Sequence, residues 1–142
     1  MDKRIFRIID ADLNRALEGL RVCEEITRFA LCDKALTLEF KNLRHSVVGI
    51  TKKWGIAKHF LLEARDSLKD AGSGSIKAEL KRADYKDIFF ANIQRAKESV
   101  RVLEEFSKLI SQKASGGLKN IRYNLYELEK KTTSRLLLVR RN

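Results

Sequence analysis

The sequence contains no proline and only seven glycines among its 142 residues. Proline ends or kinks a helix, so its absence leaves long, uninterrupted helices possible throughout the chain. The residues that dominate are Ala, Leu, Lys, Glu and Arg, which are strong helix formers. With 44% hydrophobic residues, the chain is apolar enough to bury a core. We therefore predict an all-α fold that forms a single helical domain over residues 1–142.

Cysteine is also scarce, with only Cys23 and Cys32 in the chain. No CxxC pair exists, and no set of His, Cys, Asp and Glu has the spacing of a zinc site. No run approaches the ~20 apolar residues of a membrane span, and charges interrupt the N-terminus where a signal peptide needs an apolar segment. These absences predict reduced thiols, no membrane association and a cytoplasmic location.

Aromatic residues amount to 8% of the chain and do not alternate with basic residues, so no base-stacking platform is visible. Nothing resembles a basic helix-turn-helix or a zinc module either. The net charge of +11 nevertheless predicts an anionic partner, such as a phosphorylated small molecule or nucleic acid. We favour the small molecule and keep nucleic acid as an alternative.

The most informative feature that is present is an internal repeat. Residues 14–25 read NRALEGLRVCEE and residues 94–105 read QRAKESVRVLEE, with seven identities at an offset of 80. Further on, KNLRH at 41–45 returns as KNIRY at 119–123, at an offset of 78, so the second connecting loop is two residues shorter. Each half, about 10–50 and about 90–128, is predicted to be a helical hairpin, and two such hairpins make a four-helix arrangement.

Residues between the two hairpins have no counterpart in the repeat and form a helix-plus-loop insert, which gives five to six helices in total. We expect helices at about residues 10–31, 34–54, 56–65, 75–82, 84–111 and 118–138. The candidate N-caps are Asp10 or Asp12, Asp33, Ser75, and Asp84 or Asp87. Glycines predict loops at 72–74 and 116–117.

The central helix of each hairpin carries one narrow polar stripe on a mostly apolar surface, at 100° per residue. In the two repeats the stripe consists of Asn14, Glu18, Arg21, Glu25 and Arg28, and of Gln94, Glu98, Arg101, Glu105 and Lys108. One interpretation is an exposed ladder of intrahelical ion pairs, each worth about 0.2–0.5 kcal/mol. The other is that a pseudo-two-fold axis brings two half-sites together.

In the second interpretation Arg21 and Arg101 are the catalytic pair, because guanidinium groups clamp phosphate bidentately. Glu18 and Glu98 would lie alongside and hold magnesium or orient the arginines. Arg15 and Arg95 lie at the edge of the apolar surface, where a charge needs a partner or a ligand. Either Glu24 and Glu104 are the partners of these arginines, in internal ion bridges, or the arginines bind an anion.

The insert supplies a second set of candidates. Glycines such as Gly72 allow close backbone approach to phosphate, and Asp66 and Asp70 offer oxygens to a metal ion. The same segment also reads as a plain linker, and it lacks the P-loop pattern. The candidates for substrate or phosphate binding are Asn14, Arg15, Arg44, Arg65, Asn92, Arg95 and Gly72. His45 is replaced by Tyr123 in the second repeat, which excludes a symmetric histidine role.

Several stretches of the chain are long or ordered enough to compare with known families: RIIDADLNRALEGLRV at 7–22, RDS at 65–67 with Asp70 and Gly72, ANIQRA at 91–96, RVLEE at 101–105, LRH at 43–45 and IRY at 121–123. Together they resemble the small helical phosphomethylpyrimidine kinase family of thiamine biosynthesis. Members of this family occur alone or fused N-terminal to thiamine-phosphate synthase. This chain resembles the stand-alone form, because no (β/α)₈ synthase barrel follows. It departs from the pattern at Asp12, where asparagine is expected, and at Lys97 and Ser99.

The resemblance implies ATP- and magnesium-dependent phosphorylation of hydroxymethylpyrimidine phosphate to its diphosphate. It does not assign roles to residues, so the roles above come from their chemistry. The alternatives are a non-catalytic helical domain that partners thiamine-phosphate synthase and a basic module that binds nucleic acid. A homodimer is a further expectation, because long helices with wide apolar faces often exceed what one small bundle can bury.

Overall fold

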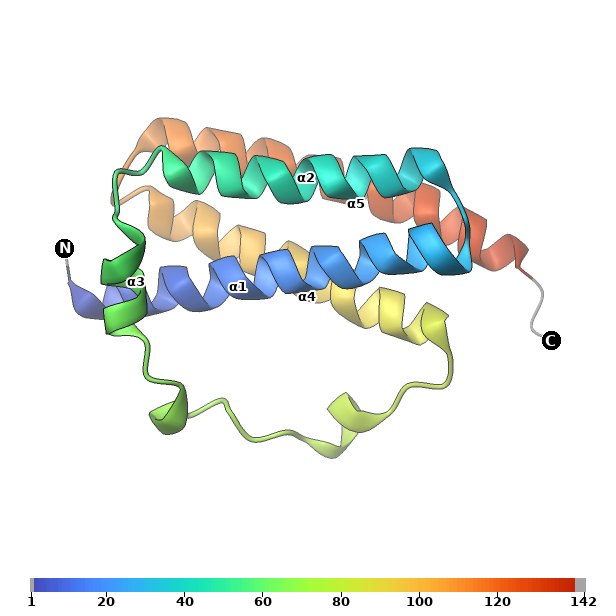
Figure 1. Ribbon diagram of the computed structural model, residues 1–142, viewed down its shortest axis with the longest axis horizontal. Helices are drawn as coiled ribbons and strands as arrows, with labels where there is room; N and C mark the ends of the chain where they lie inside the picture. The colour runs from blue at the N-terminus through green and yellow to red at the C-terminus, as the bar shows by residue number, and fades with distance from the viewer. Residues whose placement is uncertain (1, 140–142) are drawn as a thin grey trace.

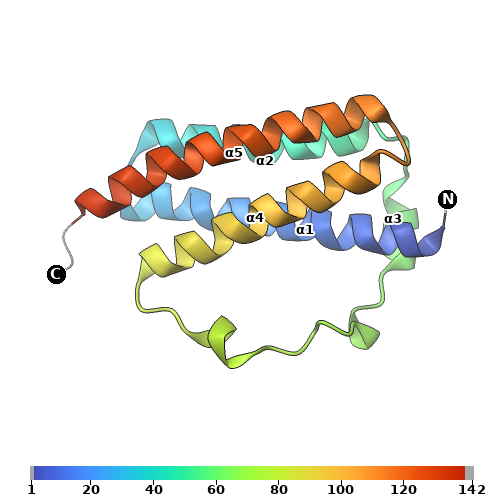
Figure 2. The ribbon, with the colours of Figure 1, turned by 180° about the vertical axis from the view of Figure 1, so that it is seen from behind.

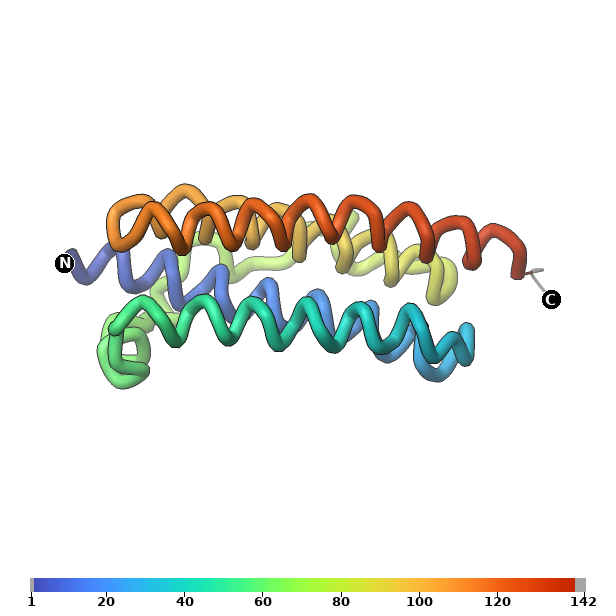
Figure 3. Tube along the Cα trace, turned by 90° about the horizontal axis from the view of Figure 1, so that it is seen from above, coloured from blue at the N-terminus to red at the C-terminus, as the bar shows by residue number. Residues whose placement is uncertain are grey.

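The computed structural model describes residues 2–139, and within that range the chain forms five α-helices and no strand. Four long helices make two layers: α2 (Lys34–Lys52) and α5 (Gln112–Leu138) lie on α1 (Lys3–Glu25) and α4 (Tyr85–Ser107) (Figure 1). Seen from above, α2 and α5 run side by side over the other pair (Figure 3). The predicted all-α bundle of two helical hairpins, α1–α2 and α4–α5, is confirmed.

The insert joins the hairpins through α3 (Lys58–Ala64), which packs on α1, and two 3₁₀ turns, η2 (Ser67–Lys69) and η3 (Lys77–Leu80). Every residue from 71 to 81 is exposed, and the segment bows away from the α1–α4 layer on the side opposite α2 and α5 (Figure 2). The helix expected at about 75–82 is therefore only a single 3₁₀ turn. Within the described residues, no helix is both long enough and apolar enough to cross a membrane.

Helix starts depend on capping and on tertiary packing. Asp33 caps α2 by accepting a hydrogen bond from the Leu36 amide at 3.0 Å, and Asp84 caps α4, as expected. The expected start of α1 is wrong: the helix begins at Lys3, with Asp2 as its N-cap, and contains Asp10 and Asp12. The extra turns form because Ile9 is fully buried and needs a helical backbone there to reach the core.

The expected loop at Gly116–Gly117 is also wrong, because both glycines lie within α5, which Ser111 caps. A Cβ atom at Gly117 would come within 2.9 Å of the Ile50 Cδ1 atom on α2. Glycine at this position therefore serves the close packing of α5 on α2 rather than a turn.

The two repeats have matching ends. Thr27 and its equivalent Ser107 each donate a hydroxyl hydrogen bond three residues back, to the Glu24 and Glu104 carbonyls at 2.9 and 2.8 Å. Asp33 and Ser111, which are equivalent at the offset of 78, both act as N-caps. The two additional residues of the first connection fall where the helix widens into a π-helical segment, η1 (Ile26–Ala30), which accommodates extra residues within a helix.

A pseudo-two-fold axis passes between α1 and α4. The helices run antiparallel (Figure 1), with Gly19 against Ala96 and Cys23 against the Phe89 carbonyl. In this register Ala16 and its repeat equivalent Ala96 lie together beside the axis, and both are completely buried. The core fills the space between the layers, where Phe40 of α2 meets Phe89 of α4 edge-on at 6.2 Å. The α1–α4 crossing therefore positions the repeat-related side chains on the outer face of the bundle.

Candidate functional site

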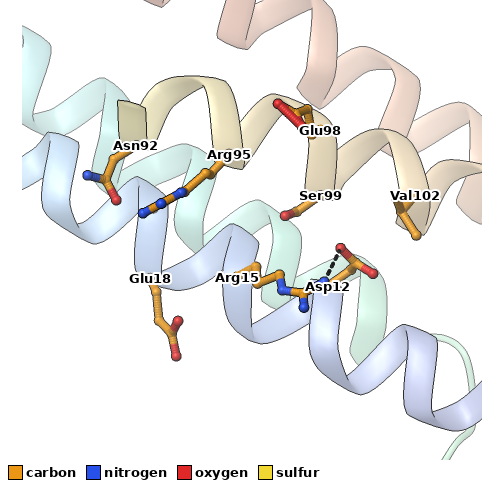
Figure 4. Close-up of a pocket in the computed structure, with 9 residues that line it drawn as sticks. Asp12, Arg15, Glu18, Asn92, Arg95, Glu98, Ser99 and Val102 are labelled. Carbon is orange, nitrogen blue, oxygen red and sulfur yellow. Dashed lines mark ion pairs between the residues drawn. The ribbon is translucent and has the colours of Figure 1, made fainter. Parts of the chain in front are cut away.

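A groove of about 500 Å³, here called the axial groove, lies on the outer face of the α1–α4 crossing (Figure 4). Its lining consists of Asp12, Arg15, Glu18, Gly19, Asn92, Arg95, Glu98, Ser99 and Val102. All but Val102 form pairs at the repeat offset of 80: Asp12 with Asn92, Arg15 with Arg95, Glu18 with Glu98, and Gly19 with Ser99. The groove thus lies on the pseudo-two-fold axis and is lined from equivalent positions in both halves of the chain.

Gly19 determines how closely the two helices approach at this groove. A Cβ atom at this position would lie 2.9 Å from the Asn92 carbonyl oxygen, which is backbone and cannot move aside cheaply. On the other side of the axis the equivalent residue is Ser99, whose hydroxyl acts on the Asp12 carboxyl to lower its pKa. The two halves therefore differ at the groove floor, and Asp12 faces a neutral equivalent, Asn92, whereas the Arg15–Arg95 and Glu18–Glu98 pairs keep the same charge.

Asp12 is the one deeply buried charge in the axial groove lining, with a residue exposure of 7%. Burial raises the pKa of the Asp12 carboxyl above its ordinary value, although the nearby Arg15 and the Ser99 hydroxyl act in the opposite direction. The Arg15 guanidinium is 3.6 Å from the carboxylate, and its side chain remains 55% exposed. Arg15 can therefore pair with Asp12 and still reach a ligand.

The remaining charges are available to a ligand. Among the described residues, Arg95 and Glu18 have no ion-pair partner within 4.0 Å and no hydrogen bond through their side chains. Glu98 accepts only a hydrogen bond at 3.1 Å from Gln94 on its own helix. Asn92 donates its side-chain amide to the Ile88 carbonyl at 2.8 Å, which holds it at the end of the groove.

A second groove of about 770 Å³, here called the insert groove, runs between α1 and the start of the insert. It is lined by Arg4, Arg7, Ile8, Asp10, Ala11, Asp12, Asn14, Arg15, Glu18, Arg65, Asp66, Ser67 and Asp70. Asp12, Arg15 and Glu18 line both grooves. Two hollows of different size and lining therefore meet along one stretch of α1.

Arg65 ties the insert to α1. Its Nε and Nη2 atoms donate to the two Asp10 oxygens, each at 2.7 Å, and this bond raises the pKa of Arg65. Asn14 donates to the same carboxylate at 3.3 Å and to the Asp10 carbonyl at 2.9 Å. Arg65 and Asn14, which we expected to bind substrate, thus line the insert groove while also anchoring its wall.

Asp66 and Asp70, our candidates for metal binding, line the insert groove, whereas Gly72 lines neither groove. Asp70 accepts a hydrogen bond from the Gly72 amide at 2.9 Å, which shapes the turn. In the described part of the chain no three His, Cys, Asp or Glu side chains converge as a metal site. Magnesium is often held by one or two carboxylates together with substrate phosphates, and this lining could supply the carboxylates.

Arg21 and Arg101 lie outside both grooves. Each bridges two glutamates of its own helix: Arg21 pairs with Glu24 at 3.5 Å and Glu25 at 3.0 Å, and Arg101 repeats this with Glu104 and Glu105 at 3.4 Å. In the observed register they are about ten residues apart along the helix direction, which is about 15 Å at 1.5 Å per residue. This part of the polar stripe thus has the geometry of the intrahelical ladder.

The buried glutamates of the repeat have a partner that the stripe alone did not predict. Glu24 accepts hydrogen bonds from Arg44 of α2 at 3.3 Å, and Glu104 accepts from Arg122 of α5 at 2.7 Å. The alternative that Glu24 and Glu104 pair with Arg15 and Arg95 is therefore wrong. The signal was present in the sequence, because Arg44 and Arg122 belong to the second repeated stretch, which packs on the first.

Comparison with known proteins gives one family. A family model described as the ThiD2 family matches residues 7–131. A thiamine-phosphate synthase from Nostoc punctiforme is 41% identical over 126 residues, covering 88% of this chain and 34% of that protein. A thiamine-phosphate synthase from Rhodopirellula baltica is 36% identical over 125 residues, covering 87% of this chain and 33% of that protein. No solved structure matches.

The chain thus spans about a third of the length of these curated relatives. The family match begins in the first turns of α1 and ends within α5, so that it includes both hairpins and the insert. It also includes every residue that lines the axial groove. On this match, the chain belongs to the ThiD2 family.

Proposed function

We propose that this protein acts in thiamine biosynthesis as an ATP-dependent kinase that converts hydroxymethylpyrimidine phosphate to its diphosphate. The observation that carries the proposal is that two unlike grooves share Asp12, Arg15 and Glu18. A kinase must bring the phosphates of two different ligands together, and a shared wall offers such a meeting point. The names of the curated relatives support the pathway.

The chemistry requires little covalent participation by the protein. An oxygen of the substrate phosphate, already ionised at neutral pH, forms a bond to the γ-phosphorus of ATP as the bond to the bridging oxygen breaks and ADP leaves. Positioning and charge neutralisation supply most of the catalysis in such transfers. Arg15 borders both grooves and is suited to contact the transferred group, while Glu18, Glu98, Asp66 and Asp70 are the candidates to hold magnesium, which would neutralise phosphate charge.

The direct test incubates the purified protein with ATP, magnesium and hydroxymethylpyrimidine phosphate, and follows the pyrimidine diphosphate by mass spectrometry. We expect a product that depends on both ATP and magnesium. Absence of the diphosphate under several metal conditions, with intact substrate recovered and the protein shown to be folded, would refute the kinase.

A second candidate is a helical domain that partners thiamine-phosphate synthase without catalysing a reaction itself. One observation favours it specifically: the relatives that carry this name match the chain over only a third of their length. This alternative predicts a stable complex with a separately produced synthase and no ATP turnover. Size-exclusion chromatography of the mixture, run beside the kinase assay, separates the two candidates.

A further inference from the structure

We propose that the axial groove binds a diphosphate group together with magnesium, with one phosphate held by each repeat. Arg15 would hold the phosphate on one side of the pseudo-two-fold axis and Arg95 the phosphate on the other. This inference rests on the proposed function, because it names the part of the ligands that the axial groove receives. A diphosphate is itself nearly two-fold symmetric about its bridging oxygen, and so it matches the symmetry of this lining.

The composition of the groove determines the kind of anion that can enter. Its charged residues are two arginines and three carboxylates, Asp12, Glu18 and Glu98. A bare polyanion would be repelled by this lining, whereas a magnesium complex brings its own positive charge. Glu18 and Glu98, related by the axis, could each approach a magnesium ion whose other ligands are phosphate oxygens and water.

The two arginines are held in different ways, which makes their contributions separable. Arg15 is positioned by Asp12, whereas Arg95 has no ion-pair partner among the described residues. Figure 4 shows Arg15 extending from α1 toward Asp12, and Arg95 extending from α4 toward the Asn92 side chain. Only a ligand that spans the pseudo-two-fold axis can therefore contact both guanidinium groups at once.

The primary experiment measures binding of magnesium pyrophosphate by isothermal titration calorimetry, with inorganic phosphate as the comparison. We expect pyrophosphate to bind only with magnesium present. Inorganic phosphate should bind at least about tenfold more weakly than pyrophosphate, because it can engage only one arginine. Arg15→Ala and Arg95→Ala should each weaken pyrophosphate binding about tenfold, because a charge-assisted bidentate contact is lost.

Two further variants keep the result interpretable. Arg95→Lys retains the charge but not the planar fork, so that we expect it to bind less tightly than the native protein. Arg28→Ala removes an exposed arginine that lines neither groove, and it should bind pyrophosphate like the native protein. Thermal unfolding followed by circular dichroism confirms that each variant is folded.

Nucleotide and pyrimidine are the two possible sources of the diphosphate, and separate titrations distinguish them. ADP is compared with AMP, and the pyrimidine diphosphate with its monophosphate, in native and Arg95→Ala protein. An Arg95-dependent preference for the diphosphate in either comparison supports the proposal and identifies the source.

The proposal is overturned if pyrophosphate does not bind, if only one of Arg15 and Arg95 matters, or if Arg21→Ala and Arg101→Ala weaken binding instead. Its failure is distinguishable from failure of the kinase. Pyrophosphate binding that depends on both arginines, without product formation, would support the diphosphate site and refute the kinase. Full kinase activity in Arg95→Ala would support the kinase and refute the diphosphate site.

Discussion

Gly19 is the residue on which the geometry of the axial groove most directly depends. We predict that Gly19→Ala destabilises the protein by about 1–3 kcal/mol, because the new methyl group would force α1 and α4 apart at the Asn92 carbonyl. Urea denaturation of the native and variant proteins measures this difference in unfolding free energy.

Gly49→Ala is the matched control, because Gly49 also lies within a helix but a Cβ atom there would meet nothing within 4 Å. Replacing glycine by alanine in an open helical position should stabilise the protein by up to about 1 kcal/mol. Equal effects of the two substitutions would contradict the close approach at Gly19.

Asp12 should make the stability of the protein depend on pH. Its folded-state pKa is raised above the ordinary value of 3.8 by burial, so its contribution to stability is greatest below that pH and is lost as pH rises through the folded pKa. Asp12→Asn, which copies the residue of the second repeat, removes this dependence. We predict that the stability of the variant relative to the native protein increases as pH rises from below 3.8, measured by denaturant unfolding across a pH series.

Glu104 supplies a control of opposite sign. Burial alone would raise the pKa of Glu104, but the hydrogen bonds and charges of Arg122 and Arg101 together outweigh it and lower the pKa below 4.5. Its stabilisation is therefore present above pH 4.5 and is lost as pH falls through the folded pKa. The loss of unfolding free energy in Glu104→Gln, relative to the native protein, should therefore become smaller in acid. If the stability difference from the native protein were independent of pH for both Asp12→Asn and Glu104→Gln, neither carboxylate would have the perturbed pKa described.

At the scale of elements, the insert differs from the rest of the chain. Residues 71–81 are exposed without exception, and Ile76 and Leu80 have no core to pack against. We predict that trypsin cuts first after Lys77 or Lys81 and leaves two fragments that stay associated through the α1–α4 contact. Mass spectrometry of a limited digest identifies the sites, and Lys77→Gln with Lys81→Gln should slow the cut. Initial cleavage within α1 or α4 would contradict this arrangement.

A repeated ion bridge links the two helices of each hairpin. The same three-residue bridge, Arg21–Glu24–Arg44, recurs as Arg101–Glu104–Arg122 and connects the central helix to its hairpin partner in each half. Each bridge places a buried glutamate between two arginines, so that removal of one cation still leaves the other. The repeated charges of these bridges hold the helices of each hairpin together, whereas the repeats of Arg15 and Glu18 line the axial groove.

At the scale of the whole molecule, charge is segregated by layer. Basic and acidic residues balance in α1, with five each, and in α4, with four each. In contrast, α2 has four basic and one acidic residue, and α5 has six and two, so these two helices carry a net charge of +7. The excess positive charge of the protein therefore lies largely on the layer opposite the grooves.

We predict that neutralising this layer leaves the proposed reaction unchanged. Lys41→Gln with Lys119→Gln removes two exposed charges on α2 and α5, far from the groove lining. The double variant should elute from a cation-exchange column at lower salt, while the KM values for ATP and the pyrimidine phosphate stay the same. A raised KM would mean that substrates use this layer. Any salt-sensitive binding of RNA or DNA, the nucleic-acid alternative, should be weakened by the same variant.

Much of this protein follows from its sequence alone. The absence of proline, the helical periodicity and the repeat at an offset of 80 determine an all-α bundle of two hairpins with an insert. N-caps such as Asp33 and Asp84 form hydrogen bonds with amides only two or three residues further along the chain, so they too can be predicted from the sequence. The pairing of repeated charges across an axis is likewise expected from the repeat, and Glu18 and Glu98 do line one groove.

Only the tertiary structure decides which of the repeated arginines meets the groove. Helical periodicity gives the direction of a side chain around its own helix but not the register of one helix along another. Here the small residues Ala16, Gly19 and Ala96 permit close approach, and that approach places Arg15 and Arg95 beside the axis while Arg21 and Arg101 lie beyond it. The bridge from Glu24 to Arg44 and the meeting of the two grooves depend in the same way on contacts between segments far apart in the chain.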